Sequence, residues 1–228
     1  MQKRIVFKRI FDIFISLVLL FLIYFLSVLL YFNSKYKPTD VYGYSMQPTL
    51  NQGISSPTIA GDKVFVNIKS TYGRGDLIMA TVPWETRGSI VKRIVGVEGD
   101  LIQIKENVLT YSLLVNGQEV AVYEKSDSSP HYPDIAGTNY YYQQYLEFLD
   151  NPNFQNNVIS INYEKYIIVN ANEYFVMGDN WGETTDSITQ GVIKAGQVNG
   201  RIDYIIPYTK NKTWETFKII ISCPFKKF

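Results

Sequence analysis

The chain has 228 residues and 46% hydrophobic content, enough to bury a core, and its length favours one principal domain. Its formal net charge is +1 and only 19% of its residues are charged, so the excess of positive charge that nucleic-acid binding needs is missing. Cys223 is the only cysteine and His131 the only histidine, which excludes an internal disulfide and argues against a zinc hydrolase. We therefore expect no cofactor, no metal ion and no nucleic-acid partner.

The N-terminal part of the chain predicts one membrane-spanning helix. Residues 13–32 form an apolar run of 20 residues, the length at which a helix crosses a bilayer. Four basic residues precede this run, whereas Lys35, Lys37 and Asp40 follow it, so the positive-inside rule places the N-terminus in the cytoplasm. The run exceeds the apolar part of a secretory signal, and no small-x-small cleavage site follows it. We expect residues 1–9 in the cytoplasm, a retained anchor at 10–32 and an extracytoplasmic domain at 33–228.

The extracytoplasmic part predicts a mainly β fold. Its short apolar runs are bounded by turn residues and lie at 64–66, 77–80, 90–97 and 101–104. Gly-Asp pairs at 61–62, 75–76 and 99–100 directly precede three of these runs, as expected of strand entrances. From about 105 to 170 the composition shifts to Tyr, Asn and Ser, which indicates a variable insertion or a smaller subdomain. The apolar run at 217–223 is too short to span a bilayer, and we expect an edge strand or a surface contact there.

Two types of residue could act as the base that activates a nucleophile in this chain, histidine and lysine. His131 lies in a turn-forming stretch, Ser128-Ser129-Pro130-His131-Tyr132-Pro133, and we expect it on a loop, whereas a triad histidine needs a rigid position. A buried lysine can lose its proton and serve as the base, because desolvation lowers its pKa. Ser-Lys pairs are an alternative to the histidine triad.

Four sequence boxes resemble those of type I signal peptidases, the serine-lysine leader peptidases of the S26 family. Ser45-Met46-Gln47-Pro48-Thr49-Leu50 is similar to the family's Ser-Met-x-Pro-Thr-Leu nucleophile box and matches every defined position. The second box comprises 61–66 with 74–78, the third 91–100, and the fourth Gly178-Asp179-Asn180 with the residues up to Ser187. The boxes come in family order between about 41 and 206, with about 105–170 unmatched. The resemblance is to the Gram-positive-like form with a single anchor.

The resemblance implies a role for each matched residue. Ser45 is the expected nucleophile and Lys92 the general base, with the backbone N–H groups of Ser45 and Gly43 binding the oxyanion. The expected supporting residues are Arg93, Gly178, Asp179, Asn180, Thr184 and Asp186, and the expected substrate-binding residues are Val41, Met46, Leu50 and Val91. In the family, the hydroxyl at the position of Thr184 steadies the lysine. The implied activity is removal of signal peptides from exported precursors at the membrane, after residues with small side chains.

Strand alternation alone does not choose between the two basic residues of the third box. In a strand over 90–95, Lys92 shares a face with Ile90 and Ile94, whereas Arg93 shares the other face with Val91 and Val95. Both faces are apolar, so the resemblance selects Lys92 as the base.

One position departs from the family pattern and keeps a second function open. The family usually has Asp-Ser-Arg in the last box, whereas this chain has Asp186-Ser187-Ile188. Arg93 and Arg201 are candidates for a replacement cation. The altered position and the insertion suggest an alternative, a membrane-anchored chaperone or assembly factor that binds exported proteins without cutting them. A self-cleaving Ser-Lys regulator is disfavoured, because such a protein carries a DNA-binding part in place of a membrane anchor.

Overall fold

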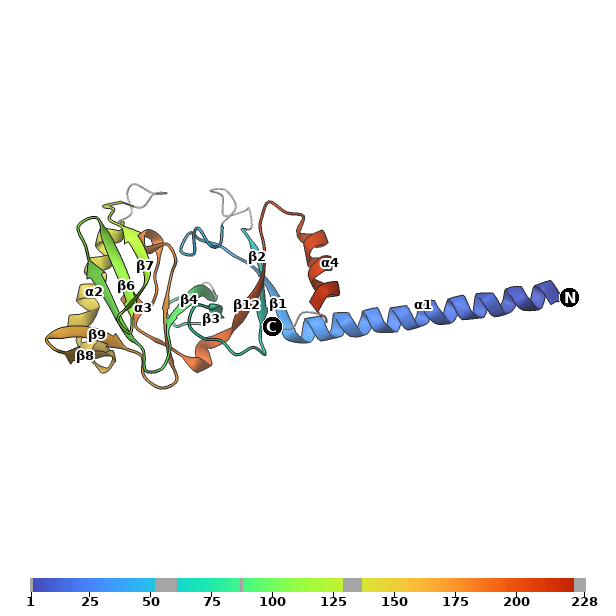
Figure 1. Cartoon of the computed structure of the whole chain (residues 1–228), viewed down its shortest axis with the longest axis horizontal. Helices are drawn as coiled ribbons and strands as arrows, with labels where there is room; N and C mark the ends of the chain where they lie inside the picture. Colours follow the sequence, from blue (N-terminus) through green and yellow to red (C-terminus); the bar gives the residue numbers. More distant parts are fainter. Residues whose placement is uncertain (1, 52–60, 87, 129–136, 224–228) are drawn as a thin grey trace.

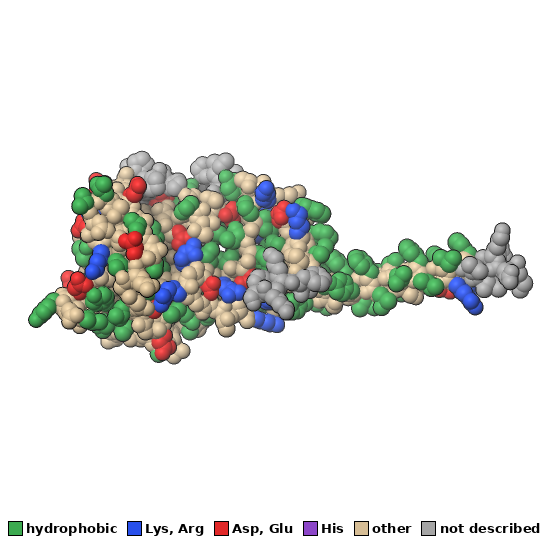
Figure 2. All heavy atoms as spheres, in the orientation of Figure 1, with side chains coloured by type: hydrophobic (Ala, Val, Ile, Leu, Met, Phe, Trp, Pro, Cys, Tyr) green, Lys and Arg blue, Asp and Glu red, His purple; other side chains and the backbone are tan. Residues whose placement is uncertain are grey.

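The computed structural model describes residues 2–51, 61–86, 88–128 and 137–223, with side chains from residue 7 onward, so His131 lies outside the described residues. Helix α1 (Gln2–Lys35) projects as a long rod from a β-rich body (Figure 1). Its segment Phe7–Lys35 has a hydropathy of 3.0 over its most apolar window and is long enough to cross a membrane. Apolar side chains cover the rod, and basic ones lie near its N-terminal end (Figure 2). Among the described side chains of α1, from residue 7 onward, Val28 and Phe32 near its C-terminal end are buried against the body.

The larger sheet has seven strands in the order β1-β2-β12-β3-β4-β10-β11. The strands are β1 (Tyr36–Asp40), β2 (Lys63–Asn67), β3 (Leu77–Ala80), β4 (Ile90–Gly96), β10 (Glu173–Met177), β11 (Ile193–Lys194) and β12 (Val198–Ile206), and all neighbours are antiparallel. The predicted strands at 64–66, 77–80 and 90–97 are confirmed within one or two residues. The Gly-Asp pairs do precede strands, because β2 and β3 begin directly after two of them.

The second sheet has five strands in the order β7-β6-β5-β9-β8, and its strands β6 to β9 lie within the segment 105–170. Its strands are β5 (Leu101–Glu106), β6 (Thr110–Val115), β7 (Gln118–Glu124), β8 (Val158–Ile161) and β9 (Glu164–Ile168). Helix α2 (Thr138–Asp150) and the 3-10 helix η1 (Pro152–Asn157) connect β7 to β8. Buried side chains of α2, among them Tyr141, Tyr145 and Phe148, pack into the hydrophobic cluster of this sheet and of β10. The predicted mainly β class is confirmed.

Short helices lie between β10 and β12 in the chain. They are η2 (Trp181–Glu183), α3 (Ser187–Gln190) and η3 (Ala195–Gln197). At the end of the described chain, residues 212–222 form helix α4 (Lys212–Ser222), so of the two alternatives expected at 217–223, an edge strand or a surface contact, the edge strand is wrong. The Asn211 side chain caps this helix by accepting a bond from the Trp214 N–H at 3.0 Å. Ile219 and Ile220 pack beside Phe32 of α1, and this tertiary packing favours the helix over a strand.

Candidate active site

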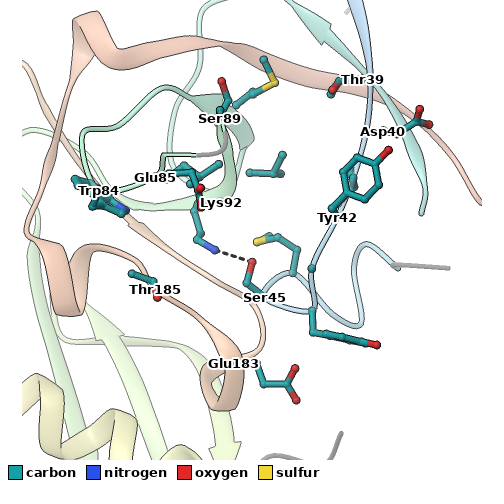
Figure 3. A pocket seen from close by; sticks show the side chains of 18 residues that line it. Thr39, Asp40, Tyr42, Ser45, Trp84, Glu85, Ser89, Lys92, Glu183 and Thr185 are labelled. Atoms are coloured by element: carbon teal, nitrogen blue, oxygen red, sulfur yellow. Dashed lines mark hydrogen bonds between the residues drawn. The ribbon is translucent and has the colours of Figure 1, made fainter. Parts of the chain in front are cut away.

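Ser45 and Lys92 meet at the edge of a large cavity. Ser45 lies in the turn segment that follows β1, and Lys92 extends from β4. Lys92 Nζ and Ser45 Oγ are hydrogen-bonded at 2.6 Å (Figure 3). Lys92 is 4% exposed, and this burial lowers the pKa of its ammonium group from 10.5 to about 8, against the opposing effect of Asp186, Asp179 and Glu85. Near pH 8 a large fraction of Lys92 is therefore neutral and able to accept a proton.

The register of β4 separates the two basic residues that alternation left undecided. Lys92 pairs with Ile78 and Arg93 with Leu77 of β3, so their side chains leave opposite faces. The guanidinium group of Arg93 forms a two-bond ion pair with Asp179, at 2.8 Å from Nε to Oδ1 and 2.6 Å from Nη2 to Oδ2. Arg93 is thus directed away from Ser45, and Lys92 is the basic residue at the serine.

Asp186 is a fully buried carboxylate whose charge acts on Lys92 of the Ser45–Lys92 pair. Its oxygens accept hydrogen bonds from the backbone N–H groups of Gly178 (2.8 Å) and Ile188 (3.0 Å), from Thr184 Oγ1 (3.0 Å) and from Tyr141 Oη (2.9 Å to each oxygen). Burial raises the pKa of Asp186, whereas Lys92 and these hydrogen bonds lower it. The charge of Asp186 in turn raises the pKa of Lys92. The two groups therefore act electrostatically as a pair.

The turn after β10 contacts the backbone of the serine segment. The Asn180 N–H donates to the Ser45 carbonyl at 3.1 Å, and the Asn180 side chain donates to the Tyr44 carbonyl at 3.2 Å. Gly178 packs so closely that a Cβ atom there would lie 2.6 Å from the Ser45 carbonyl oxygen and 2.2 Å from Thr184 Oγ1. The turn thus fixes the position of Ser45 relative to Asp186, and it tolerates only glycine at 178.

The cavity next to Ser45 and Lys92 has a volume of about 690 Å³. Its lining includes the apolar side chains Val41, Met46, Met79, Ile90 and Val91, and the acidic side chains Asp40, Glu85 and Glu183. Figure 3 shows the Lys92 and Ser45 side chains directed toward each other among the lining residues. Gly43 also lines the cavity, with a φ of 92° that favours glycine. The cavity therefore opens beside a serine hydroxyl that is in contact with a buried lysine.

A model of the family described as signal peptidase, peptidase S26, matches residues 14–207. The chain belongs to this signal peptidase family. Signal peptidase IB of Staphylococcus aureus (strain COL) is 28% identical over 182 residues, which cover 78% of this chain and 82% of the relative. Signal peptidase I of Aquifex aeolicus (strain VF5) is 26% identical over 196 residues, covering 72% and 73% of the two chains. A crystal structure of a signal peptidase I from Enterococcus faecalis V583 aligns with a TM-score of 0.33 and 21% identity, over 58% of this chain and 97% of that one.

The residues that the signal peptidase boxes singled out gather around Ser45, with two differences from expectation. Val41, Met46 and Val91 line the cavity, but Leu50 is fully buried in the cluster beneath it and does not reach the cavity. The hydroxyl of Thr184 donates to Asp186, so the hydrogen bond found for it supports the carboxylate and not Lys92 directly.

The departure from the signal peptidase pattern at Ile188 has a structural counterpart. Ile188 is 1% exposed and packs in the same hydrophobic cluster as α2. Neither candidate arginine replaces the missing cation, because Arg93 binds Asp179 and Arg201 donates to Asp203 at 2.8 Å. Tyr141 supplies a hydrogen bond to Asp186 instead. Sequence reasoning missed Tyr141, since the run Tyr140-Tyr141-Tyr142 gives no sign of a partner 45 positions away.

Proposed function

We propose that the chain removes signal peptides from exported precursors, with Ser45 as nucleophile and Lys92 as general base. The observation that carries this proposal is the 2.6 Å contact between a serine hydroxyl and a buried lysine whose pKa is lowered to about 8. A serine hydroxyl is a weak nucleophile until a base removes its proton, and a neutral amine at this distance can do so. Membership of the signal peptidase family supports the same reaction.

The reaction proceeds through an acyl-enzyme. Neutral Lys92 accepts the Ser45 proton while Oγ attacks the scissile carbonyl carbon, and the backbone N–H groups of Ser45 and Gly43 donate to the resulting oxyanion. The intermediate collapses, the C–N bond breaks, and the leaving amine takes the proton from Lys92. A water molecule then gives a proton to Lys92 and attacks the ester carbonyl, which releases the signal peptide and returns the proton to Ser45 Oγ.

The cavity supports the proposed substrate class. The signal peptidase family implies precursors with small residues before the cut, and the apolar wall of Val41, Met46 and Val91 beside Ser45 offers contacts for small apolar side chains. The turn Gly178-Asp179-Asn180 holds Ser45 through its backbone, and Arg93 fixes that turn through Asp179. Thr184 holds Asp186, whose charge acts on Lys92.

The proposed location is the cell membrane, with α1 as a single anchor, residues 1–9 in the cytoplasm and the domain 33–228 outside. The exposed apolar surface of the rod supports the anchor, and the basic residues near the start of α1 support its orientation. Helix α4 lies across the axis of α1, on the side of the body from which α1 projects (Figure 1). Trp214, Phe217 and Ile221 on α4 are exposed and spaced three and four residues apart, so they share one helix face. This face suits contact with the lipid surface.

The alternative of a non-cleaving chaperone fits the site less well, since a binding protein has no use for a serine in contact with a buried lysine. The deciding experiment incubates the full chain in detergent with a precursor, and compares wild type with Ser45→Ala and Lys92→Ala. We expect cleavage by the wild type and loss in both variants. Stable binding of the precursor without cleavage by the wild type would establish the chaperone function. Undiminished cleavage by the variants would refute the assignment of Ser45 and Lys92 as nucleophile and base.

A further inference from the structure

The hydroxyl of Tyr141 is buried against the carboxylate of Asp186 from a segment outside the signal peptidase boxes. Tyr141 is 2% exposed and donates to both carboxylate oxygens at 2.9 Å. It belongs to α2, which lies within the segment 105–170 that contains none of the four signal peptidase boxes. Its ring stacks on that of Trp181 at 4.8 Å, and Trp181 directly follows the turn that contacts Ser45. The phenol is therefore held in place from two sides.

Tyr141 keeps its proton, and so remains a hydrogen-bond donor, far above neutral pH. Burial and the neighbouring Asp186 raise the pKa of its hydroxyl well above 10, with a smaller contribution from Tyr123. A neutral donor directed at a carboxylate offsets part of its negative potential. Because the charge of Asp186 raises the pKa of Lys92, a weaker potential at Lys92 favours the neutral amine. Asp179 and Glu85 also raise the pKa of Lys92, but neither accepts a bond from Tyr141.

We propose that Tyr141 is a positioning residue that supports the Asp186–Lys92 pair with a neutral hydroxyl, in a chain that has Ile188 where the family pattern has an arginine. The consequence is that α2 belongs to the catalytic apparatus and is more than an insertion on its rim. The inference rests on the proposed function, because it needs Lys92 to act as the base.

The test is the pH dependence of kcat/KM for precursor cleavage by Tyr141→Phe. Removal of the hydroxyl takes away one of the donors that offset the charge of Asp186, so the limb on which activity rises with pH moves upward by about 0.5 to 1 unit. At pH 7 the variant is then about three- to tenfold slower, and above the limb its rate approaches that of the wild type. A merely structural tyrosine leaves the limb in place, whatever happens to the maximal rate, and an unmoved or lowered limb would overturn the proposal.

Tyr145→Phe is the matched control. Tyr145 lies one turn further along α2, is also 2% exposed, and contacts the backbone of Ile104 in place of Asp186. The same chemical change there should leave the limb where it is. Should Tyr141→Phe fail to fold, 3-fluorotyrosine at position 141 provides a second test, since its more acidic hydroxyl donates more strongly and should move the limb downward. An unmoved limb with this analogue would also overturn the proposal.

Lys92→Ala, assayed in parallel, separates this inference from the proposed function. Loss of cleavage in Lys92→Ala together with an unmoved limb in Tyr141→Phe would refute the role of Tyr141 alone. Full cleavage by Lys92→Ala would refute Lys92 as the base, and with it the inference.

Discussion

Arg93 holds Asp179 in a two-bond ion pair, with the nitrogen–oxygen distances at 2.8 and 2.6 Å. Arg93 follows Lys92 on β4, and Asp179 precedes Asn180, whose N–H donates to the Ser45 carbonyl. The ion pair therefore connects the strand that carries the base to the turn that contacts the nucleophile. Of the two side chains, Arg93 is about a third exposed and Asp179 less so, which makes this pair a positional contact more than a source of stability.

We predict that Arg93→Lys lowers kcat about tenfold, because a lysine keeps the charge but cannot form the two parallel bonds, and small displacements of catalytic groups are costly. The pH at which activity rises should not change. Arg74→Lys is the control, since Arg74 makes a similar pair with Asp100 away from Ser45. Steady-state cleavage of a precursor measures both, and equal rates for Arg93→Lys and wild type would contradict the prediction.

Gly178→Ala should reduce cleavage by about 100-fold, because the added methyl group overlaps the Ser45 carbonyl oxygen and Thr184 Oγ1 and must displace them. Gly196→Ala offers a comparison, since a Cβ atom at position 196 meets nothing within 4 Å. Single-turnover cleavage and circular dichroism together separate a displaced nucleophile from a misfolded domain. Full activity in a folded Gly178→Ala protein would show that the turn does not position Ser45.

Lys92→Met should abolish cleavage and yet stabilise the protein at pH 7. The pKa of Lys92 falls from 10.5 in the unfolded chain to about 8 in the folded one, so burial of its charge costs about 3 kcal/mol below pH 8. In the wild type the unfolded state binds more protons between pH 8 and 10.5, and stability rises with pH across that window. We expect the variant to be about 1 to 3 kcal/mol more stable at pH 7, with the difference vanishing above pH 10.5.

Denaturant unfolding in detergent at both pH values checks this prediction. Equal stability of the two proteins at pH 7 would mean that Lys92 is not buried as a costly charge.

The sequence predicted the strands and the N-terminal helix well and the C-terminal segment less well, for a physical reason. Strand entrances are local, since a Gly-Asp turn followed by an apolar run is enough to place β2, β3 and β5. Helix α4 depends on distant partners, because Ile219 and Ile220 acquire their buried face only through contact with Phe32 and Tyr204. When those partners are unknown, an isoleucine-rich run therefore predicts a strand, because isoleucine is enriched in strands.

The site shows the same division. Ser45 and Lys92 are identified by short motifs, but alternation could not separate Lys92 from Arg93, because apolar neighbours flank both. Only the partner strand and Asp179 decide the direction of each side chain. The role of Tyr141 could not be predicted from the sequence, because its contact with Asp186 depends on how α2 packs against α3 and η2.

Helix α4 should lie at the lipid surface when α1 spans a bilayer. In liposomes, lipids brominated near the headgroups should quench the fluorescence of Trp214, whose side chain is 55% exposed on the apolar face. Trp214→Phe should remove most of the quenching, because Trp181 is buried and Trp84 is only partly exposed. Tyr163 is an exposed aromatic between β8 and β9, and these strands lie at the end of the body opposite α1 (Figure 1), so Tyr163→Ser should have no effect. Quenching that persists in Trp214→Phe would place α4 away from the membrane.

The central claim, that neutral Lys92 deprotonates Ser45, is tested most directly by the pH dependence of single-turnover precursor cleavage. The wild-type rate should rise about tenfold per pH unit below pH 8 and level off above it, because one group with a pKa of about 8 must lose its proton. Ser45→Ala and Lys92→Ala should show no cleavage at any pH. A wild-type rate that is flat between pH 6 and 9, or a Lys92→Ala variant that retains the same rising limb, would contradict the account.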